Sequence, residues 1–347
     1  MPQPGPGPLN LITDVAGLKV GQAEDAAVRS GVTVIVAEGR AVCAVDVRGG
    51  APGTRETDAL APENLVDEAD AVVLAGGSVY GLAAADGVTA VLGAGGQGYQ
   101  MSRAAQASRA PGVPVSPIVP AAILYDLANG GDKAWGEAPP YRELGIAALR
   151  AADRRFALGT AGAGYGAMAG RLKGGLGSAS AIGELGFTVG AIVAVNSFGA
   201  AVAPGGRCFW AAPYEIAREF GGLGSAGLAA GPDDWGLAKG PVVAERVNTT
   251  IACVATDAAL TPAEAKRLAI MAQDGLARAL RPAHAPFDGD VVFALATGKR
   301  AVEAPRLGVV ARLGALAADC LARAIARGVY EATAWPDTAV TCWRDLE

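Results

Sequence analysis

The sequence predicts an α/β (α+β) protein in which sheets are sandwiched between helices. Two observations support this fold class. Short apolar runs that end at glycine-rich turns alternate in blocks with longer alanine-rich segments of helical spacing. The chain has 347 residues, enough to bury a sizeable core as one large domain or two small ones.

Most of the expected strands lie before residue 200. Each is a short apolar run bounded by glycine, proline or polar turn residues. In chain order the expected strands cover residues 18–21, 31–36, 41–47, 71–75 and 190–195. Helices are expected over 79–92 and 144–155. From residue 203 to 241 the chain is loop-rich and holds many glycines, so we expect an exposed, mobile linker there.

A new pattern begins at residue 249. Strands are expected over 251–256 and 290–296, separated by a helix from 262 to about 280, and a closing helix covers 306–327. The first of these helices starts at Thr261-Pro262-Ala263-Glu264, a capping box with proline at the first helical position.

Composition narrows the class of protein. Hydrophobic residues make up 51% of the chain and charged residues 18%, which is unusually apolar for a soluble monomer. No uninterrupted run of about 18 apolar residues occurs, so we expect no membrane span. The apolar excess favours burial between subunits, and we therefore expect a homo-oligomer. A net charge of −5 does not indicate a nucleic-acid partner.

Cysteine usage and the first residues indicate a cytoplasmic protein without a metal. The five cysteines are far apart and odd in number, and no Cys-x-x-Cys pair occurs, so neither a zinc site nor a disulfide framework is expected. Residues 1–8 have neither the basic nor the apolar region of a signal peptide.

The strongest chemical signal is Asn248-Thr249-Thr250, at the mouth of an expected core strand. The chain has one histidine, His284, which fits poorly with a serine–histidine–aspartate triad or a histidine-rich metal site. A threonine freed by backbone cleavage needs neither, because its own α-amino group, which titrates near ~8, can take the hydroxyl proton. Taken alone, however, Thr249 and Thr250 read as ordinary β-branched strand residues.

A series of ordered motifs carries a resemblance over roughly residues 11–335. The motifs cover residues 12–21, 46–58, 74–88, 172–180, 248–250 and 288–294. Together they resemble the self-processing aminopeptidase/amidase family that includes the L-aminopeptidase/D-amidase-esterase, the β-peptidyl aminopeptidases and the nylon-oligomer hydrolase.

The resemblance implies an αββα sandwich that cuts itself between Asn248 and Thr249. The products would be a large α chain (1–248) and a small β chain (249–347) of one domain, assembled as a tetramer of processed units. Peptidases of the family have Gly-Ser at this junction, whereas Asn-Thr is similar to the nylon-oligomer (6-aminohexanoate oligomer) hydrolase.

The resemblance also implies roles for single residues, with Thr249 as the nucleophile. Asn196, which otherwise reads as a turn or cap, would supply an oxyanion-hole amide. Tyr125, otherwise a packed strand-end tyrosine, would donate to the tetrahedral intermediate. Lys173, otherwise a solvated loop charge, would lie near the nucleophile and stabilise the oxyanion or lower the pKa of the amine.

Two glycine-containing turns complete the expected site. Asp288 and Asp290 flank Gly289, either as an ordinary turn or, by resemblance, behind the nucleophile, where two nearby carboxylates would raise one pKa. Gly76-Gly77-Ser78 follows a strand and could bind a phosphate, but it matches neither a P-loop nor GxGxxG. We expect this turn to lie near the substrate. His284 is expected to be structural or exposed and not catalytic.

These residues predict a self-cleaving N-terminal-threonine amide hydrolase that needs no metal or organic cofactor. Its substrate would be a small peptide or an oligoamide, with endo-hydrolysis of 6-aminohexanoate oligomers as one candidate. Three alternatives stay open: an exo-acting aminopeptidase, D-amidase or β-aminopeptidase; an acyltransferase of the ornithine acetyltransferase type; and a non-enzymatic binding protein that uses the Gly76-Gly77-Ser78 turn.

Overall fold

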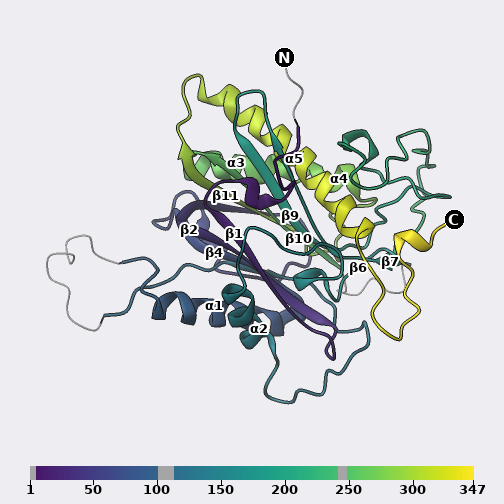
Figure 1. Ribbon diagram of the computed structural model, residues 1–347, viewed down its shortest axis with the longest axis horizontal. Coiled ribbons are helices and arrows are strands. Elements are labelled where there is room, and N and C mark those ends of the chain that lie inside the picture. The colour runs from purple at the N-terminus through teal and green to yellow at the C-terminus, as the bar shows by residue number, and fades with distance from the viewer. Residues whose placement is uncertain (1–4, 101–112, 241–247) are drawn as a thin grey trace.

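The computed structural model describes residues 5–100, 113–240 and 248–347, and it has the predicted αββα architecture (Figure 1). The main strands are β1 (Leu18–Asp25), β2 (Ser30–Val47), β4 (Glu68–Ala75), β8 (Leu176–Ile182), β9 (Thr188–Asn196), β10 (Thr249–Ala258) and β11 (Val291–Arg300). Shorter strands are β3 (Thr54–Arg55), β5 (Ala121–Ile123), β6 (Met168–Ala169) and β7 (Leu172–Lys173). The helices are α1 (Ala83–Ala94), α2 (Tyr141–Arg150), α3 (Pro262–Ala272), α4 (Asp274–Ala279) and α5 (Arg306–Tyr330).

Nine of these strands form one sheet that supplies both inner layers, whereas β6 and β7 pair in a separate 2-stranded sheet. The order in the larger sheet is β3-β5-β4-β2-β11-β10-β9-β8, and β1 pairs with β2 outside this path. The long strand β2 connects the layers, because its first part pairs with β1 and β4 whereas its last residues pair with β11. At the centre, β10 runs antiparallel to β9 and parallel to β11.

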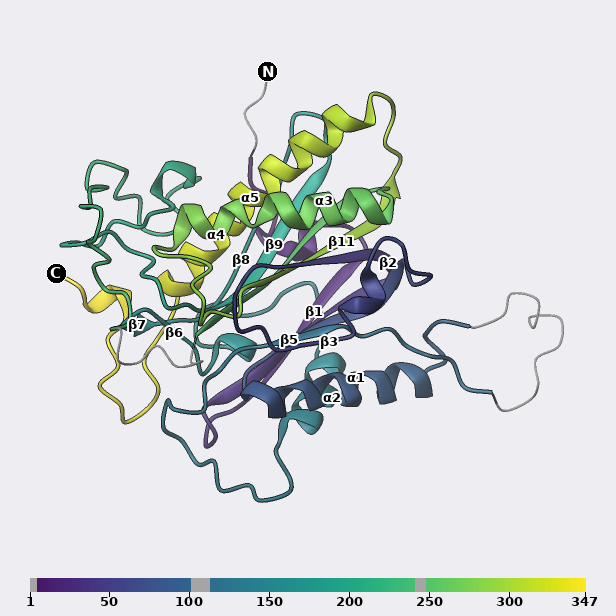
Figure 2. The ribbon, with the colours of Figure 1, turned by 180° about the vertical axis from the view of Figure 1, so that it is seen from behind.

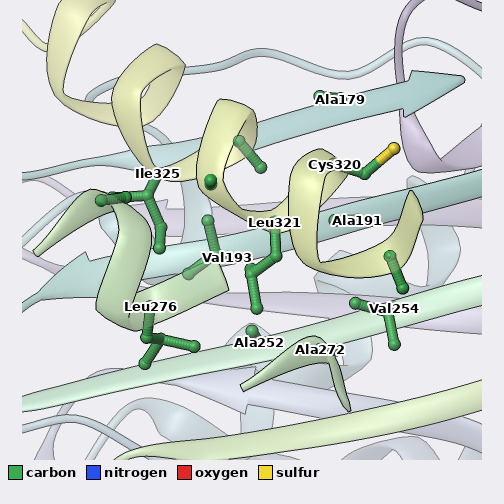
Figure 3. Close-up of a cluster of buried hydrophobic side chains, with 14 of the residues drawn as sticks. Ala179, Ala191, Val193, Ala252, Val254, Ala272, Leu276, Cys320, Leu321 and Ile325 are labelled. Carbon is green, nitrogen blue, oxygen red and sulfur yellow. The ribbon is translucent and has the colours of Figure 1, made fainter. Parts of the chain in front are cut away.

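Three clusters of buried apolar side chains hold the layers of the sandwich together. Helices α3, α4 and α5 cover the β8–β11 layer, with Leu276, Leu321 and Ile325 packed against Val193 and Val254 (Figure 3). A second cluster fills the space between the two strand layers, and a third lies under α1 and α2 on the opposite side (Figure 2).

Strand β10 contributes side chains to two of these clusters. Its side chains alternate with the period of 2 of a strand, so that Ile251 and Cys253 face the inner cluster while Ala252 and Val254 face the helices. Each fully buried Val, Leu or Ile side chain contributes roughly 1.5–3 kcal/mol. The central strands are therefore held from both sides.

Small residues let helix α5 approach the sheet closely. A Cβ on Gly177 in β8 would lie 1.8 Å from the carbonyl oxygen of Ala324 in α5, so no larger residue fits there without moving the helix. The many glycines and alanines in the sequence therefore allow close packing of helices on the sheet.

Several expected boundaries were wrong. The expected strands 31–36 and 41–47 are the single strand β2, whose register with β4 shifts between Val36 and Ala41, around Gly39 with φ 90°. The expected helix 144–155 is α2, which runs from Tyr141 only to Arg150, because Asp153 turns back and exchanges two backbone hydrogen bonds with Val20 of β1.

Two further helices differ in detail. The expected helix 79–92 begins with a 3-10 turn, Ser78–Leu82, before α1. The expected helix from 262 to 280 has the predicted capping box at Thr261 and Glu264, but it breaks at Gln273 into α3 and α4. The buried side-chain amide of Gln273 donates to the carbonyl of Asp46 at the break.

The loop-rich segment 203–240 is not a simple exposed linker. Phe209 and Phe220 are buried in it and pack edge to face, 5.5 Å between ring centres. Glu219 forms an ion pair of 2.5 Å with Arg323 of α5. Residue 241, the last of the expected linker, lies outside the described part of the chain. Among the described helices, none is long and apolar enough to cross a membrane.

Candidate active site

The ends of two neighbouring central strands bring Thr249 and Asn196 together. Thr249 is the first residue of β10 and Asn196 the last of β9, and the two are paired directly in the antiparallel register. Thr249 is 5% exposed and Asn196 2% exposed. Asn196 and Thr249, the two polar residues at the ends of expected strands, therefore lie next to each other in the fold.

The peptide bond before Thr249 has donors on its carbonyl oxygen. The Thr249 hydroxyl donates to the Asn248 carbonyl, and the backbone N–H of Gly289 donates to the same oxygen at 3.1 Å. A Cβ on residue 289 would lie 2.8 Å from Thr249 Oγ1, so this close approach requires glycine. The hydroxyl thus lies beside the peptide bond that the sequence predicts to be cut, and a backbone donor is aimed at its oxygen.

The two carboxylates of the Asp288-Gly289-Asp290 turn are buried behind Thr249. Asp290 Oδ1 accepts from the Thr250 N–H at 2.9 Å. Asp288 accepts from the backbone N–H groups of Phe198 and Ala285, both at 3.3 Å. Burial, followed by the neighbouring charge of Asp290, raises the pKa of the Asp288 carboxyl. A proton can therefore reside on this pair near neutral pH.

His284 has a closer relation to the site than the sequence suggested. Its ring Nδ1 lies 2.9 Å from Asp290 Oδ2, and its backbone N–H donates to the same oxygen at 3.0 Å. The side chain is 26% exposed, so it is partly buried against Asp290 rather than free in a loop. Its place four residues before Asp288, in a proline-containing loop, was the only signal for this contact in the sequence.

Lys173 is fully buried and is not a solvated loop charge. Its Nζ donates to the carbonyls of Gly164, Ala167 and Gly174 at 3.3, 3.0 and 2.7 Å. It also lies 4.8 Å from the ring centre of Trp335. Burial lowers the pKa of Lys173 to about 7.

A single peptide group connects Lys173 to Asn196. The Ala167 carbonyl that accepts from Lys173 belongs to the same peptide as the Met168 N–H, which donates to Asn196 Oδ1 at 2.9 Å. Asn196 Nδ2 in turn donates to the Tyr125 carbonyl at 3.0 Å. The structure therefore places Lys173 one peptide group behind Asn196, and its hydrogen bonds are to backbone carbonyls.

The Gly76-Gly77-Ser78 turn is not a phosphate site. Its three backbone N–H groups donate within the protein, to the Gly31 carbonyl at 2.9 Å, Asp126 Oδ1 at 2.7 Å and the Leu124 carbonyl at 2.9 Å. An anion would find these donors already used. Ser78, with φ 53°, lines the cavity described below.

Asp126 is a buried residue that the sequence analysis did not single out. Its second oxygen accepts from the Ser30 hydroxyl at 2.7 Å, while the first holds Gly77. Burial raises the pKa of Asp126 to about 6. The motif residue Tyr125 stands directly before it, so Asp126 connects the tyrosine segment to the turn at Ser78.

A cavity of about 1030 Å³ opens onto Thr249. Glycine, proline, apolar and hydroxyl-bearing residues line it: Gly50, Ala51, Pro52, Gly53, Ser78, Val79, Leu82, Ile123, Tyr125, Thr249, Pro286 and Phe287. Tyr125 and Ser78 thus share one cavity with the expected nucleophile. A substrate amide can therefore approach the Thr249 hydroxyl through this space.

The described residues contain no group of three or more His, Cys, Asp or Glu side chains suited to a metal ion. All five cysteines are free and buried.

The chain is similar to known proteins over most of its length. The model of peptidase family S58 matches residues 10–340. An uncharacterized aminopeptidase of Mycobacterium tuberculosis (strain ATCC 25618 / H37Rv) is 44% identical over 97% of this chain and 98% of its own length. The 6-aminohexanoate-oligomer endohydrolase of Agromyces sp. (strain KY5R) is 28% identical over 86% of this chain and 81% of its own.

Two solved structures share the fold. The L-aminopeptidase D-Ala-esterase/amidase of Ochrobactrum anthropi, described as a variant of the Ntn hydrolase fold, superposes with a TM-score of 0.69 at 21% identity, over 98% of this chain and 92% of its own. A β-aminopeptidase of Burkholderia sp. gives 0.67 at 22% identity, over 96% and 89%.

Proposed function

Because the chain belongs to peptidase family S58, and is thus a hydrolase of peptide or amide bonds, we propose that it is a self-cleaving N-terminal-threonine hydrolase. One observation carries the proposal: the Thr249 hydroxyl and the Gly289 N–H both donate to the carbonyl oxygen of Asn248. A nucleophile and an oxyanion donor on one peptide bond are the two groups that acyl transfer needs.

Self-cleavage begins when Thr249 Oγ1 attacks the Asn248 carbonyl carbon. The oxygen of that carbonyl takes the negative charge, which the Gly289 N–H stabilises. The C–N bond then breaks, and the hydroxyl proton passes to the leaving nitrogen, which becomes the α-amine of Thr249. The buried Asp288/Asp290 pair can carry this proton. Water hydrolyses the resulting ester to an Asn248 carboxylate and restores the Thr249 hydroxyl.

Turnover uses the same hydroxyl on a substrate amide in the cavity. The freed α-amine of Thr249, titrating near ~8, takes the hydroxyl proton as the hydroxyl attacks. Asn196 and Tyr125 are the groups proposed to stabilise the oxyanion, because Asn196 pairs with Thr249 and Tyr125 lines the cavity. The amine of the product leaves with a proton, and water releases the acyl group.

The test of self-cleavage is the mass of the purified protein and the sequence of its fragments. We expect two fragments, the smaller beginning Thr-Thr-Ile-Ala-Cys. Thr249→Ala should remain one full-length, inactive chain, whereas Thr249→Ser, which keeps a hydroxyl, should still cut itself. Cleavage at this junction in Thr249→Ala would remove Thr249 as the nucleophile.

Two substrate classes remain candidates because the relatives differ. The mycobacterial relative at 44% identity is named an aminopeptidase, which favours removal of N-terminal residues. The relative at 28% identity is named an endohydrolase of 6-aminohexanoate oligomers, which favours cutting within an oligoamide. Mass spectrometry of the products from short peptides, β-peptides and aminohexanoate oligomers distinguishes the two.

A further inference from the structure

His284 contacts one oxygen of Asp290 with two of its groups. Its backbone N–H donates to Asp290 Oδ2 at 3.0 Å, and its ring Nδ1 lies 2.9 Å from the same oxygen. The residue has φ 56°, in the left-handed region that few residues other than glycine adopt. Such a conformation persists where the surrounding structure holds it, and it is common at functional sites. The single histidine of the chain is thus held against a carboxyl of the site in an unusual conformation.

The two buried carboxyls of the turn have unequal sets of donors. Asp290 has the Thr250 N–H at 2.9 Å in addition to the two groups of His284. Asp288 has two backbone N–H donors, and both hydrogen bonds are longer, at 3.3 Å. Hydrogen bonds to the charged form of a carboxyl favour that form. The negative charge of the pair is therefore more stable on Asp290, and a shared proton is more stable on Asp288.

Asp288 is the carboxyl of the pair that can keep a proton near neutral pH. Burial, followed by the charge of Asp290, raises the pKa of Asp288 to about 7, and the positive charge of Lys239 opposes this rise. Asp288 also forms a parallel bridge with Asn248, the residue before the expected cut. The proton is thus held by the member of the pair that lies alongside the residue before the scissile bond.

His284 is connected to the site through Asp290 and not through the substrate cavity. Its side chain is 26% exposed, whereas Asp290 is 2% exposed. In the described part of the chain, the residues that line the cavity at Thr249 include Pro286 and Phe287 but not His284. A role for His284 must therefore be exerted on the carboxyl pair.

We infer that His284 is a positioning residue for this pair: its Nδ1–H donates to Asp290 and keeps that carboxylate ionised, so that the proton of the pair stays on Asp288. During self-cleavage the bond from Thr249 Oγ1 to the Asn248 carbonyl carbon forms, and the C–N bond between the two residues breaks. Asp288 gives its proton to the leaving nitrogen, and the hydroxyl proton of Thr249 replaces it on the pair. The inference rests on the proposed function, because it assigns a role in the same cleavage.

Two substitutions of His284 separate the hydrogen bond from the bulk of the side chain. His284→Leu keeps a side chain of similar bulk but has no donor. His284→Asn has an amide N–H donor the same number of bonds from the backbone as Nδ1, and asparagine tolerates a positive φ. The unprocessed chains are purified in urea and refolded by dilution at pH values from about 5 to about 9, a range that brackets the titration of the pair. Denaturing gels measure the cleaved fraction over time, and tryptophan fluorescence measures folding.

The position of the pH–rate profile is the decisive readout. Without the ring donor the charged form of the pair is less stable, so the pair holds its proton more tightly. We expect the profile of His284→Leu to lie about one pH unit above that of the wild type, and that of His284→Asn within about 0.3 unit of it. A purely structural role of His284 would lower the rate equally at every pH. A profile of His284→Leu at the wild-type position would overturn the inference.

The protonation of the ring provides a second measurement, which needs no cleavage. Because the chain has one histidine, the imidazole signals in NMR spectra of ¹⁵N-histidine-labelled protein belong to His284. The label is placed in Thr249→Ala, which is expected to stay intact. We expect a ring that carries a proton on Nδ1 at neutral pH, either as the neutral Nδ1–H tautomer or as the imidazolium. The Nε2–H tautomer would make Nδ1 an acceptor and require a proton on Asp290, which would overturn the inference.

Failure of this inference can be told apart from failure of the proposed function. If the wild type cuts itself but the profile of His284→Leu is unshifted or the ring is the Nε2–H tautomer, the hydrolase stands and only the role of His284 is removed. If the wild type never cuts itself, the proposed function fails. The NMR measurement then still decides whether His284 donates to an ionised Asp290.

Discussion

The ammonium of Lys173 is buried, and it donates hydrogen bonds to the backbone around it. A buried cation needs several partners to offset the loss of water, and Lys173 finds them in three carbonyls and the Trp335 ring. One of these carbonyls belongs to the peptide that donates to Asn196. Lys173 therefore binds the same peptide group as Asn196, the residue proposed to stabilise the oxyanion.

Lys173→Met should lower kcat with little change in KM. The Ala167–Met168 peptide loses its hydrogen bond from Lys173, whereas the residues that line the cavity are unchanged.

The stability of the protein should depend on pH through Lys173, with a sign that its pKa defines. Burial lowers the pKa of Lys173 from 10.5 to about 7, so between these values the unfolded chain binds a proton that the folded chain does not. The contribution of Lys173 to the free energy of unfolding therefore rises with pH across this window.

The variant lacks this rise. The free energy of unfolding of Lys173→Met relative to the wild type should be most favourable below pH 7 and should decline as pH increases toward 10. Urea titrations at several pH values measure the difference. Lys299→Met is the control, since Lys299 is exposed and its ammonium stays in water. A difference that does not vary with pH would contradict a buried, titrating Lys173.

Elements were easier to predict from the sequence than the contacts between them. The strands at 190–195 and 251–256 and the capping box at Thr261 follow from local patterns that the structure confirms. The contact of Asp126 with Gly77 joins residues 49 apart, and Lys173 reaches Asn196 through a peptide of another segment. Such pairs depend on which loops the sheet brings together, which no local pattern encodes.

The Asp288-Gly289-Asp290 turn is clamped by the segment that follows β2. Ala51 N–H donates to the Asp288 carbonyl at 2.8 Å, and Arg48 N–H donates to the Asp290 carbonyl at 3.0 Å. Two of the motifs found far apart in the sequence therefore form one support for Thr249. These two hydrogen bonds stabilise the position of the turn beside Thr249.

Gly289→Ala should slow self-cleavage strongly without preventing folding. Its Cβ would lie 2.8 Å from both Thr249 Oγ1 and the Ala51 carbonyl oxygen, closer than such atoms approach in proteins. The hydroxyl must then move from the Asn248 carbonyl. The cleaved fraction over time on denaturing gels measures the effect. Gly206→Ala, where a Cβ meets nothing within 4 Å, is the control and should cleave at the wild-type rate. Equal rates in both variants would contradict the proposed geometry.

At the scale of the whole molecule, the expected cut lies in the middle of one sheet. Strand β10, which follows the cut, pairs with β9, which precedes it, and β11 pairs with β2. All residues of β10 are buried. Each fully buried Val, Leu or Ile there contributes roughly 1.5–3 kcal/mol, so breaking a single peptide bond at the strand end leaves these layers intact.

The two fragments should therefore remain one particle after cleavage. We expect them to co-elute in native size-exclusion chromatography and to separate only in denaturant.

Two features favour self-association of the processed protein. They are its apolar composition, with a mean hydropathy of +0.30, and exposed apolar side chains such as Ile182 and Leu185. Light scattering should then give a mass that is a whole-number multiple of 34.5 kDa, four by the family resemblance. Fragments that separate in native buffer would show that the cut divides the fold, and a mass of one unit would contradict the homo-oligomer, because the apolar surface would then face water.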